Sequence, residues 1–564
     1  MADPITIYGT PVVQGVAYAP ALWIRRPELP PESAPALPDD VREAEVSRFL
    51  DCANAVADSL MNRASKTTGQ AADVLIVTSS LATDRAWTKD VSKRIRDGIP
   101  AIQAVMKATE RFVVMFETAG GVMAERTTDL RDVRDRVIAH LQGVPEPGIP
   151  HCDYPFVLLA DDLSPADTAS LDPNLCVAIV TQLGGPTSHT SIISRQLAIP
   201  CIVAARQVDQ IASEVPVLVD GGTGAITTGI DEAAALEKVR SDVARLELIR
   251  SWTGPAQTSD GVHIQLLANV QDGPSATSAH ESSFAEGVGL MRTELAFLDH
   301  PTEPSVEEQA RSYSQALLAW SGSKVVVRTL DAGSDKPVAY ATLRDEPNPA
   351  LGVRGIRING IHPNVLANQL DAIAVAAMTA PDTDVWVMAP MIATAAEARW
   401  FAGLINERND VFGVSLKAGV MVEVPATAIL IDQIMEYVDF VSIGTNDLTQ
   451  YTMAADRLSA NLAEYSDPWQ PAPLALIRKV VEAGLRLGKP VGVCGEAAAD
   501  PLLACVLVGM GVTSLSMASS AISGVGAQLG QVSLEQCHAA ADAVVGAFDG
   551  GDGRYRARHA LGLE

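Results

Sequence analysis

Gln-Leu-Gly-Gly-Pro-Thr-Ser-His-Thr-Ser-Ile-Ile-Ser-Arg-Gln-Leu-Ala-Ile-Pro-Cys-Ile-Val, residues 182–203, is the stretch from which the fold can be laid out. The apolar run from Val177 to Val180 just before it predicts a buried strand, and the residues from His189 onward predict a helix. Gly184 and Gly185 have no Cβ, so the backbone between strand and helix can turn sharply and approach a bulky group. The stretch therefore predicts a strand–turn–helix unit with a histidine at its bend.

His189 has two possible roles at this bend. Free N–H groups and the positive end of the helix dipole favour a negative group there, and a neutral imidazole beside them can attack phosphorus. His189 would then carry a covalent phosphoryl group. Alternatively, the histidine caps the helix and is hydrogen-bonded to Thr187 or Ser188. The stretch alone favours neither role.

Size and charge restrict the class of protein. The chain has 564 residues, too many for one core, and its length predicts three or four domains. The 68 acidic and 42 basic side chains give a net charge of −26, which argues against nucleic acid or an anionic membrane surface as the main partner. No secretory signal is visible, and the longest apolar run, 501–510, is too short to span a bilayer. The seven cysteines are an odd number without close pairs. These features predict a cytoplasmic protein without membrane insertion.

The first part of the chain reads as a small α/β domain with a helical insertion. Short strands are expected within residues 5–24, and strands resume at 154–160 and before the bend at His189. Between about 39 and 142 the apolar residues recur at helical spacing. Within this block the run 125–136 carries both signs densely and predicts a solvated helix with i,i+4 ion pairs. We therefore expect an α/β domain from residues 1–32 and 143–230, an all-helical subdomain at 33–142 and a linker helix at 231–255.

The second part alternates apolar runs with helical segments. Eight such runs predict strands: 264–270, 287–292, 324–330, 385–389, 418–422, 438–443, 490–493 and 514–517. Eight strand–helix units in succession indicate a (β/α)8 TIM barrel, here expected at 256–548 with a C-terminal tail at 549–564. The fold class predicted for the whole chain is α/β.

Polar residues follow most of these runs, where a barrel places its active site. They are Asn269, Arg292 to Glu294, Arg328 to Asp331 with Lys336 beyond, Glu423, Asn446 with Asp447, and Cys494 to Glu496. Because an unpaired buried charge is costly, these residues are better explained as one polar site at the barrel mouth than as packing.

The residue types at this mouth suggest a ligand. Glu423 and Asp447 would face each other from neighbouring strands, with Asn446 beside them, and such oxygen ligands suit Mg2+. The alternative is a carboxylate pair bridged by an arginine. The cations expected opposite them are Arg292, Arg328, Lys336, Arg354, Arg357 and Arg457. Because guanidinium groups bind carboxylate and phosphate in a bidentate manner, the site should take a small anion that carries both groups.

Cys494 adds a further chemical group. A thiol at a strand end beside cations can donate a proton to carbon or attack as a nucleophile. The alternative is an inert core cysteine.

Seven motifs, in this order, closely resemble those of enzyme I of the bacterial phosphoenolpyruvate-dependent sugar phosphotransferase system, the phosphoenolpyruvate-protein phosphotransferases. They are Gly-Gly-Pro-Thr-Ser-His (184–189), Gly-Leu-Met-Arg-Thr-Glu (289–294), Arg-Thr-Leu-Asp-Ala-Gly-Ser-Asp-Lys (328–336), Asn-Pro-Ala-Leu-Gly-Val-Arg-Gly-Ile-Arg (348–357), Val-Glu-Val-Pro (422–425), Ser-Ile-Gly-Thr-Asn-Asp-Leu-Thr-Gln-Tyr (442–451) and Val-Cys-Gly-Glu (493–496). The resemblance extends over nearly the whole chain, including the helical insertion.

The resemblance implies a role for each candidate residue. Phosphoenolpyruvate would be bound by Arg292, Arg328, Asn446, Asp447 and Arg457, with Lys336 and Arg354 completing the cationic set, while Glu423 and Asp447 hold Mg2+. His189 would attack the phosphorus and Cys494 would protonate the methylene carbon of the enolate. The phosphoryl group would then pass to the carrier HPr, which docks on the helical insertion in that family. The histidine domain must therefore swivel between the two partners, and the family pattern also implies a homodimer formed through the barrel.

Two departures and three alternatives accompany this hypothesis. Residues 71–84 replace the acidic, His-containing helix that usually meets the carrier, and Gly-Ser-Asp-Lys at 333–336 replaces Gly-Gly-Asp-Lys. A dikinase-type enzyme shares the histidine and barrel modules, but it needs an ATP domain for which this chain lacks the length and the Gly-rich loop. A non-catalytic phosphoenolpyruvate sensor would not need His189 or Cys494. A scaffold phosphorylated by another kinase is the third alternative.

Overall fold

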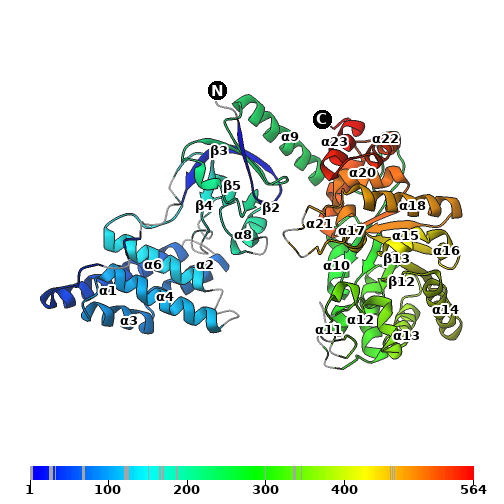
Figure 1. Ribbon diagram of the computed structural model, residues 1–564, viewed down its shortest axis with the longest axis horizontal. Helices are drawn as coiled ribbons and strands as arrows, with labels where there is room; N and C mark the ends of the chain where they lie inside the picture. Colours follow the sequence, from blue (N-terminus) through cyan, green and yellow to red (C-terminus); the bar gives the residue numbers. More distant parts are fainter. Residues whose placement is uncertain are drawn as a thin grey trace. The chain divides into compact units, whose positions relative to one another are not determined.

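The computed structural model divides into two compact units, Met1–Leu246 and Glu247–Glu564 (Figure 1). It describes residues 4–563 except 25–28, 32–33, 66–69, 120–125, 150–151, 164–166, 168–170, 186–187, 299, 301, 334–337, 339, 344–345, 458, 460–461 and 463. The finer domain boundaries given above stay predictions.

The first unit contains an eight-stranded sheet with the strand order β1-β8-β7-β3-β4-β5-β6-β2. Its strands are β1 (Ile5–Tyr8), β2 (Thr10–Val13), β3 (Val16–Trp23), β4 (Phe156–Ala160), β5 (Cys176–Thr181), β6 (Cys201–Val203), β7 (Pro216–Asp220) and β8 (Ala225–Thr228). Although more than a hundred residues separate β3 from β4 in sequence, the two pair in parallel. The helical block is therefore inserted between two neighbouring strands of one sheet, as predicted.

The described residues of the inserted block form the helices α1 (Arg42–Ala64), α2 (Gln70–Ala82), α3 (Arg85–Arg96), α4 (Ala101–Ala119) and α6 (Thr127–Gln142). Their apolar faces meet in a core of their own. In it the rings of Phe49 and Trp87 pack edge to face with centroids 5.6 Å apart. The block therefore buries a stripe from each helix, which is the reason for the helical spacing in its sequence.

The charged run of α6 corrects one expectation. Asp132, Asp135 and Arg136 are buried, although the sequence predicted a solvated helix. The Arg136 guanidinium is fully buried and forms ion pairs with Asp132 (2.8 Å), Glu146 (3.2 Å) and Asp167 (2.9 Å). The Asp132–Arg136 pair has the predicted i,i+4 spacing, but Glu146 and Asp167 come from segments before and after β4, which spacing within the helix could not reveal. These ion pairs offset the desolvation penalty of burying the Arg136 guanidinium.

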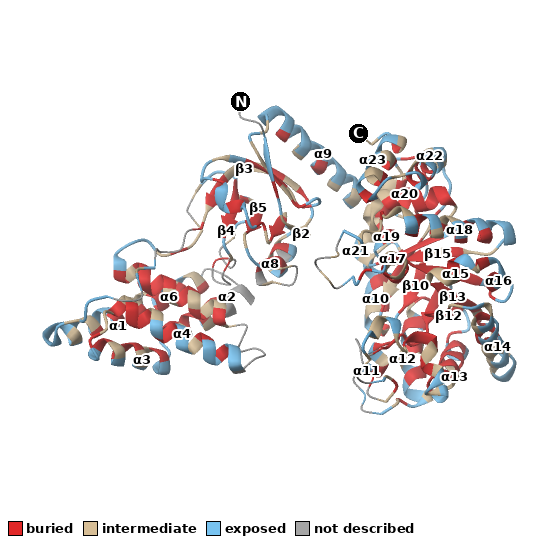
Figure 2. Ribbon diagram, in the orientation of Figure 1, coloured by how far each residue is buried: buried red, intermediate tan, exposed pale blue. Residues whose placement is uncertain are grey.

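The second unit is a closed barrel of eight parallel strands in which β16 pairs with β9. The strands are β9 (Gln265–Val270), β10 (Gly287–Met291), β11 (Lys324–Arg328), β12 (Asp384–Ala389), β13 (Lys417–Val422), β14 (Phe440–Gly444), β15 (Val491–Cys494) and β16 (Ser514–Met517). All eight expected strands are confirmed, and so is the α/β class with its TIM barrel. Figure 2 shows that the barrel strands are mostly buried.

Helices surround the barrel and cover its outer face. They are α10 (Gly273–Ser282), α11 (Leu295–Leu298), α12 (Val306–Ala319), α13 (Pro363–Thr379), α14 (Ala395–Phe412), α15 (Pro425–Ile429), α16 (Ile431–Met435), α17 (Thr445–Met453), α18 (Pro471–Leu487), α19 (Glu496–Ala499), α20 (Pro501–Met510), α21 (Ser519–Leu529), α22 (Leu534–Val545) and α23 (Gly550–Leu561). Capping boxes at Asp272, Ser305, Thr394 and Ser533 satisfy the first free N–H groups of four of them. The last helix, α23, packs against α20 and α22.

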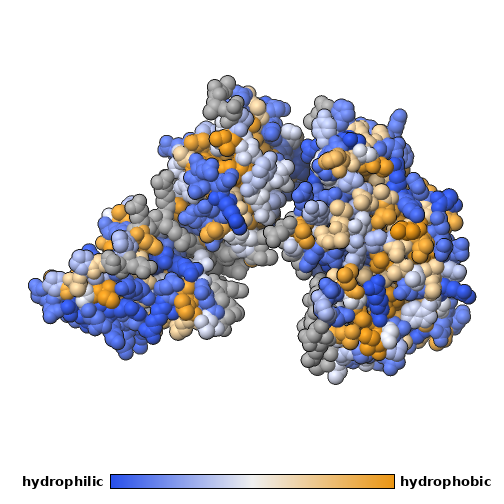
Figure 3. Space-filling view, viewed as in Figure 1, coloured by the Kyte–Doolittle hydropathy of each residue, from blue (hydrophilic) through white to orange (hydrophobic). Residues whose placement is uncertain are grey.

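Two further features complete the fold. The helix α9 (Glu232–Ser251) contains the boundary between the units, and its Asp242 Oδ2 accepts a hydrogen bond of 2.8 Å from the Val16 N–H group. The visible surface is largely hydrophilic with scattered apolar patches (Figure 3). Within the described part of the chain, no helix is both long enough and apolar enough to cross a membrane.

Candidate active site

A cavity of about 620 Å3 opens at the carboxyl ends of the barrel strands. Its lining comes from segments that are far apart in sequence but follow β10, β11, β13, β14 and β15, so the barrel topology brings them together. The predicted residues that line it are Arg292, Arg328, Arg354, Glu423, Asn446, Asp447, Arg457 and Cys494. Arg357 does not line it, and Lys336 lies outside the described residues.

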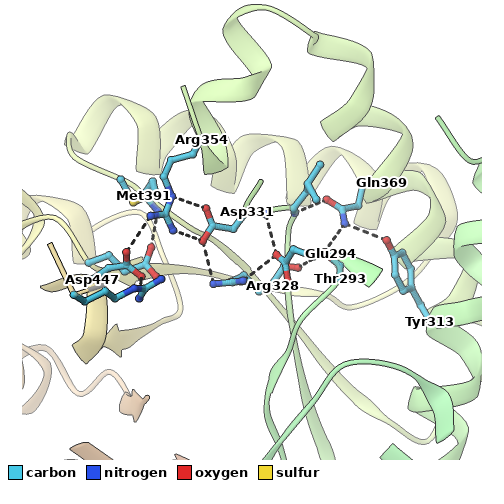
Figure 4. Close-up of polar contacts among 12 residues, drawn as sticks. Thr293, Glu294, Tyr313, Arg328, Asp331, Arg354, Gln369, Met391 and Asp447 are labelled. Atoms are coloured by element: carbon cyan, nitrogen blue, oxygen red, sulfur yellow. Dashed lines mark hydrogen bonds and ion pairs between the residues drawn. The ribbon is translucent and has the colours of Figure 1, made fainter. Parts of the chain in front are cut away.

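The central feature of the cavity is a chain of side chains with alternating charge (Figure 4). Arg328 Nη2 donates to Glu294 Oε1 (2.9 Å), and Arg328 Nη1 donates to Asp331 Oδ2 (3.2 Å). Arg354 Nη2 donates to the same Asp331 oxygen (2.7 Å), and Arg354 Nη1 donates to Asp447 Oδ1 (3.0 Å). Burial alone would lower the pKa of both arginines, but the neighbouring carboxylates outweigh this effect and raise the pKa above its usual value. Both arginines therefore remain cationic.

Two observations show that the lining suits an anion only together with a cation. Arg328 Nε is buried and has no hydrogen-bond partner among the described residues, so a donor is available to a ligand. The described lining, however, carries five carboxylates (Glu294, Asp331, Glu423, Asp447 and Glu496) and four guanidinium groups (Arg292, Arg328, Arg354 and Arg457). A small polyanion therefore needs additional positive charge before it can bind here.

Glu423 and Asp447 are the residues that could hold such a cation. Glu423 is 1% exposed and accepts a hydrogen bond of 2.9 Å from the Met391 N–H group, which Met391 presents from a left-handed backbone conformation (φ 60°). Burial, reinforced by the charges of Asp331 and Asp447, raises the pKa of Glu423 to about 8.

The described residues of the cavity fit Mg2+ only if two carboxylates are its protein ligands. No group of three or more His, Cys, Asp or Glu side chains with metal-binding geometry occurs among the described residues. Mg2+ commonly takes one or two carboxylates and completes its octahedron with water and substrate oxygens, so Glu423 and Asp447 suffice. Asp447 also pairs with arginines, with Arg354 at 3.0 Å and Arg457 at 3.4 Å. The alternative prediction was that an arginine bridges Glu423 and Asp447. In the structure Arg354 instead bridges Asp331 and Asp447.

Cys494 ends β15 inside the barrel and is 2% exposed. Ser442 Oγ donates to its sulfur at 3.4 Å, and the thiol donates to the Ile443 carbonyl at 3.5 Å. Burial raises the pKa of this thiol to about 11. Because the group stays protonated near neutral pH, it is suited to donating a proton rather than to nucleophilic attack.

The bend at residue 189 belongs to the first unit. The helix α8 (His189–Leu197) begins at His189, and Ser188 is its cap, with an Oγ that accepts from the Ser191 N–H group at 3.3 Å. The capping function is therefore performed by Ser188, and His189 occupies the first helical position. The side chain of His189, like Pro186 and Thr187, lies outside the described part of the chain.

Some residues of the cavity had no role assigned from the sequence. Glu294 and Asp331 were noticed only as polar residues after strands, and nothing in the motif spacing indicated that they bind the arginines directly. Tyr451 Oη accepts from Arg354 Nη1 at 3.4 Å, a contact between segments 97 residues apart. The signal available for Glu294 and Asp331 was their position just after a buried strand, whereas Tyr451 lies within α17 (Thr445–Met453) and had no such signal.

Comparison with known proteins gives the class of the chain. The profile of the PEP-binding domain of PEP-utilising enzymes matches residues 246–534, which contain the barrel and its cavity. The mobile-domain profile of the same enzymes matches residues 153–224, and their N-terminal profile matches 8–126. Fold and cavity together thus define a PEP-utilising enzyme.

Three relatives narrow this class. The chain is 44% identical to the phosphoenolpyruvate-protein phosphotransferase of Streptomyces coelicolor over 560 residues, 99% of this chain and 100% of the relative. It is 35% identical to that of Staphylococcus carnosus, with 92% of each chain covered. A multiphosphoryl transfer protein of Rhodobacter capsulatus is 42% identical over 416 residues, 72% of this chain and 50% of the relative. The chain belongs to the phosphoenolpyruvate-protein phosphotransferases, the enzyme I family, which confirms the resemblance found in the sequence.

Proposed function

We propose that this protein transfers the phosphoryl group of phosphoenolpyruvate to its own His189 and then to a histidine of the carrier HPr, releasing pyruvate. The observation that carries the proposal is the cavity at the barrel mouth, where four arginines, two candidate metal ligands and a protonated thiol meet. Phosphoenolpyruvate has the phosphate and the carboxylate that such a site requires.

Each residue has a defined task in the transfer. Arg292, Arg328, Arg354, Arg457 and Asn446 bind the phosphate and carboxylate oxygens, with Lys336 completing the set, and so orient the phosphorus. Arg328 Nε supplies the donor that has no protein partner. Glu423 and Asp447 hold Mg2+, which when bound supplies positive charge that stabilises the phosphate and enolate oxygens.

The reaction has two chemical steps, phosphoryl transfer and protonation at carbon, and each breaks one bond and forms one. A ring nitrogen of His189 attacks phosphorus as the bond from phosphorus to the enol oxygen breaks, which leaves the enolate of pyruvate. The Cys494 thiol then gives its proton to the methylene carbon, and solvent returns a proton to the sulfur. Protonation at carbon makes the transfer favourable, because the enolate is far less stable than pyruvate. Phosphohistidine finally passes its group to HPr.

A labelling experiment tests the proposal. Purified protein with Mg2+ and radiolabelled phosphoenolpyruvate should become labelled without ATP, and the label should be lost in acid. His189→Ala should abolish labelling, whereas His559→Ala, at an exposed position of α23, should not. A label that requires ATP would favour a dikinase-type reaction. Binding without labelling would favour a sensor, and labelling only by an added kinase would favour a scaffold.

The proposal extends to partners and assembly. HPr should dock on the helical subdomain at 33–142, the barrel should form a homodimer, and the protein should act in the cytoplasm. When HPr is added, the chemical-shift changes or crosslinks of this protein should therefore map to the helical block. Sedimentation of the protein alone should give twice the mass of one chain. Crosslinks confined to the barrel would contradict the carrier site.

A further inference from the structure

Asp331 lies just beyond the end of β11 and contacts both central arginines of the cavity (Figure 4). Its side chain is 3% exposed. Oδ1 accepts from Arg354 Nε at 3.0 Å, and Oδ2 accepts from Arg354 Nη2 at 2.7 Å and from Arg328 Nη1 at 3.2 Å. One carboxylate therefore forms a bidentate pair with one guanidinium and a single bond with the other.

These bonds fix how each guanidinium group is oriented in the cavity. In Arg354, Asp331 holds the edge with Nε and Nη2, and Nη1 points away from Asp331 and donates to Asp447 at 3.0 Å and to Tyr451 at 3.4 Å. In Arg328, Nη1 is held by Asp331 and Nη2 by Glu294, while Nε has no partner among the described residues. Because a guanidinium is planar, fixing two of its nitrogens fixes the direction of the third.

The backbone of Asp331 is itself held in place. Its N–H group donates to Glu294 Oε1 at 3.0 Å, and the preceding N–H group, of Leu330, donates to Gln369 Oε1 at 2.9 Å. A carboxylate that only neutralised charge would need no such support. The anchoring indicates that the position of this carboxylate matters as well as its charge.

We propose that Asp331 is a positioning residue that sets the orientation and separation of the Arg328 and Arg354 guanidinium groups, so that both can address one ligand carrying a phosphate and a carboxylate. The inference rests on the proposed function and adds to it the residue that determines the spacing of the two recognition groups. An asparagine cannot replace Asp331, because its NH2 group would face a guanidinium donor and the bidentate pair would be lost.

The test uses 2-phospholactate, a saturated analogue of phosphoenolpyruvate that cannot form an enolate, with Mg2+ in a calorimetric titration. Asp331→Asn should bind it at least about tenfold more weakly than the unsubstituted protein, the effect expected for a lost charge-assisted bidentate pair. Asp371→Asn is the matched control. Asp371 pairs with Arg408 on the outer helices at 3.0 Å, away from the cavity, and its substitution should leave the affinity unchanged.

A double-mutant cycle distinguishes positioning from general loss of structure. If Asp331 acts chiefly through its bidentate pair with Arg354, Arg354→Met should weaken binding, and adding Asp331→Asn should weaken it by much less than Asp331→Asn does alone. The double variant removes a cation and an anion together, so it keeps the comparison valid if Asp331→Asn alone folds poorly. As a second readout, Asp331→Asn should still accept a phosphoryl group on His189 from phosphorylated HPr, a transfer that does not use the barrel.

The outcomes separate the two claims. Unaltered affinity in Asp331→Asn, or losses that multiply in the double variant, would overturn the positioning role while leaving the proposed function intact. Failure of the unsubstituted protein to bind 2-phospholactate with Mg2+ would overturn both.

Discussion

At the scale of single residues, the barrel interior favours Cys494 as a proton donor over Cys494 as a nucleophile. Its thiol lies among apolar side chains that fill the barrel, including Leu290, Met388 and Phe440. Desolvation of this kind disfavours a thiolate, which is why the pKa rises to about 11. A thiol of low pKa would favour nucleophilic chemistry, so the environment supports the role of an acid.

Cys494→Ala should therefore separate two steps of the reaction. Phosphorylation of His189 in a single turnover should be largely retained, while formation of protonated pyruvate should slow by about 10²-fold or more, the usual contribution of a general acid. Rapid-quench measurements of phosphoprotein and pyruvate would show the difference. Cys505→Ala, a buried cysteine of α20, is the control and should affect neither rate. An equal loss in both steps would remove Cys494 from the acid role.

At the scale of elements, the mouth of the barrel depends on how the end of β11 is tied to α13. Gln369 of α13 is fully buried, and its Oε1 accepts from the Leu330 N–H group at 2.9 Å. Its amide nitrogen donates to Thr293 Oγ1 (3.0 Å) and to Tyr313 Oη (3.1 Å). Thr293 Oγ1 in turn donates to the carbonyl of Arg328 at 3.0 Å. This network fixes the backbone at Arg328 and just after it.

Gln369→Leu should weaken both stability and substrate binding. The change leaves buried polar groups unpaired, which should cost about 2–4 kcal/mol in the free energy of unfolding. It should also raise the KM for phosphoenolpyruvate, because Arg328 loses its support. Denaturant unfolding and steady-state kinetics would measure the two effects.

The control is an amide at the opposite end of the barrel. Asn409 of α14 holds both the N–H and the C=O group of Leu416, at 2.7 and 3.0 Å, just before β13 begins. Asn409→Leu should therefore lower stability by a similar amount but leave KM unaltered. If Gln369→Leu changes stability alone, the network serves the fold and not the site.

At the scale of the whole molecule, the hydrophobic periodicity of the sequence and the position of polar residues after strands predicted the fold and the cavity, but not the tertiary contacts. The alternation of apolar runs with helical segments identified all eight barrel strands, because strands and helices of a parallel barrel follow one another in sequence order. The rule that polar residues follow barrel strands then located the cavity. What spacing could not give was pairing across the fold: that Arg136 would be buried by Asp167, or that Asp331 would bind Arg354, depends on contacts between segments that are distant in sequence.

The division into two units leads to the last prediction. The two ends of α9 belong to different units, since Asp242 binds the Val16 N–H group, whereas Trp252, just after the helix, packs edge to face on Phe284. A break after residue 251 therefore leaves each anchor with its own unit. Residues 1–251 should fold and accept a phosphoryl group from phosphorylated HPr, but not from phosphoenolpyruvate. Residues 252–564 should fold and bind 2-phospholactate with Mg2+.

Mixing the two fragments should restore little transfer from phosphoenolpyruvate, because the covalent link supplies a high effective concentration of one unit near the other. Cooperative unfolding of each fragment and phosphohistidine formation, alone and mixed, would be measured. Phosphorylation of the first fragment by phosphoenolpyruvate without the barrel would contradict the assignment of the substrate site. Recovery of the full rate in the mixture would show that the link is not needed to bring His189 to the cavity.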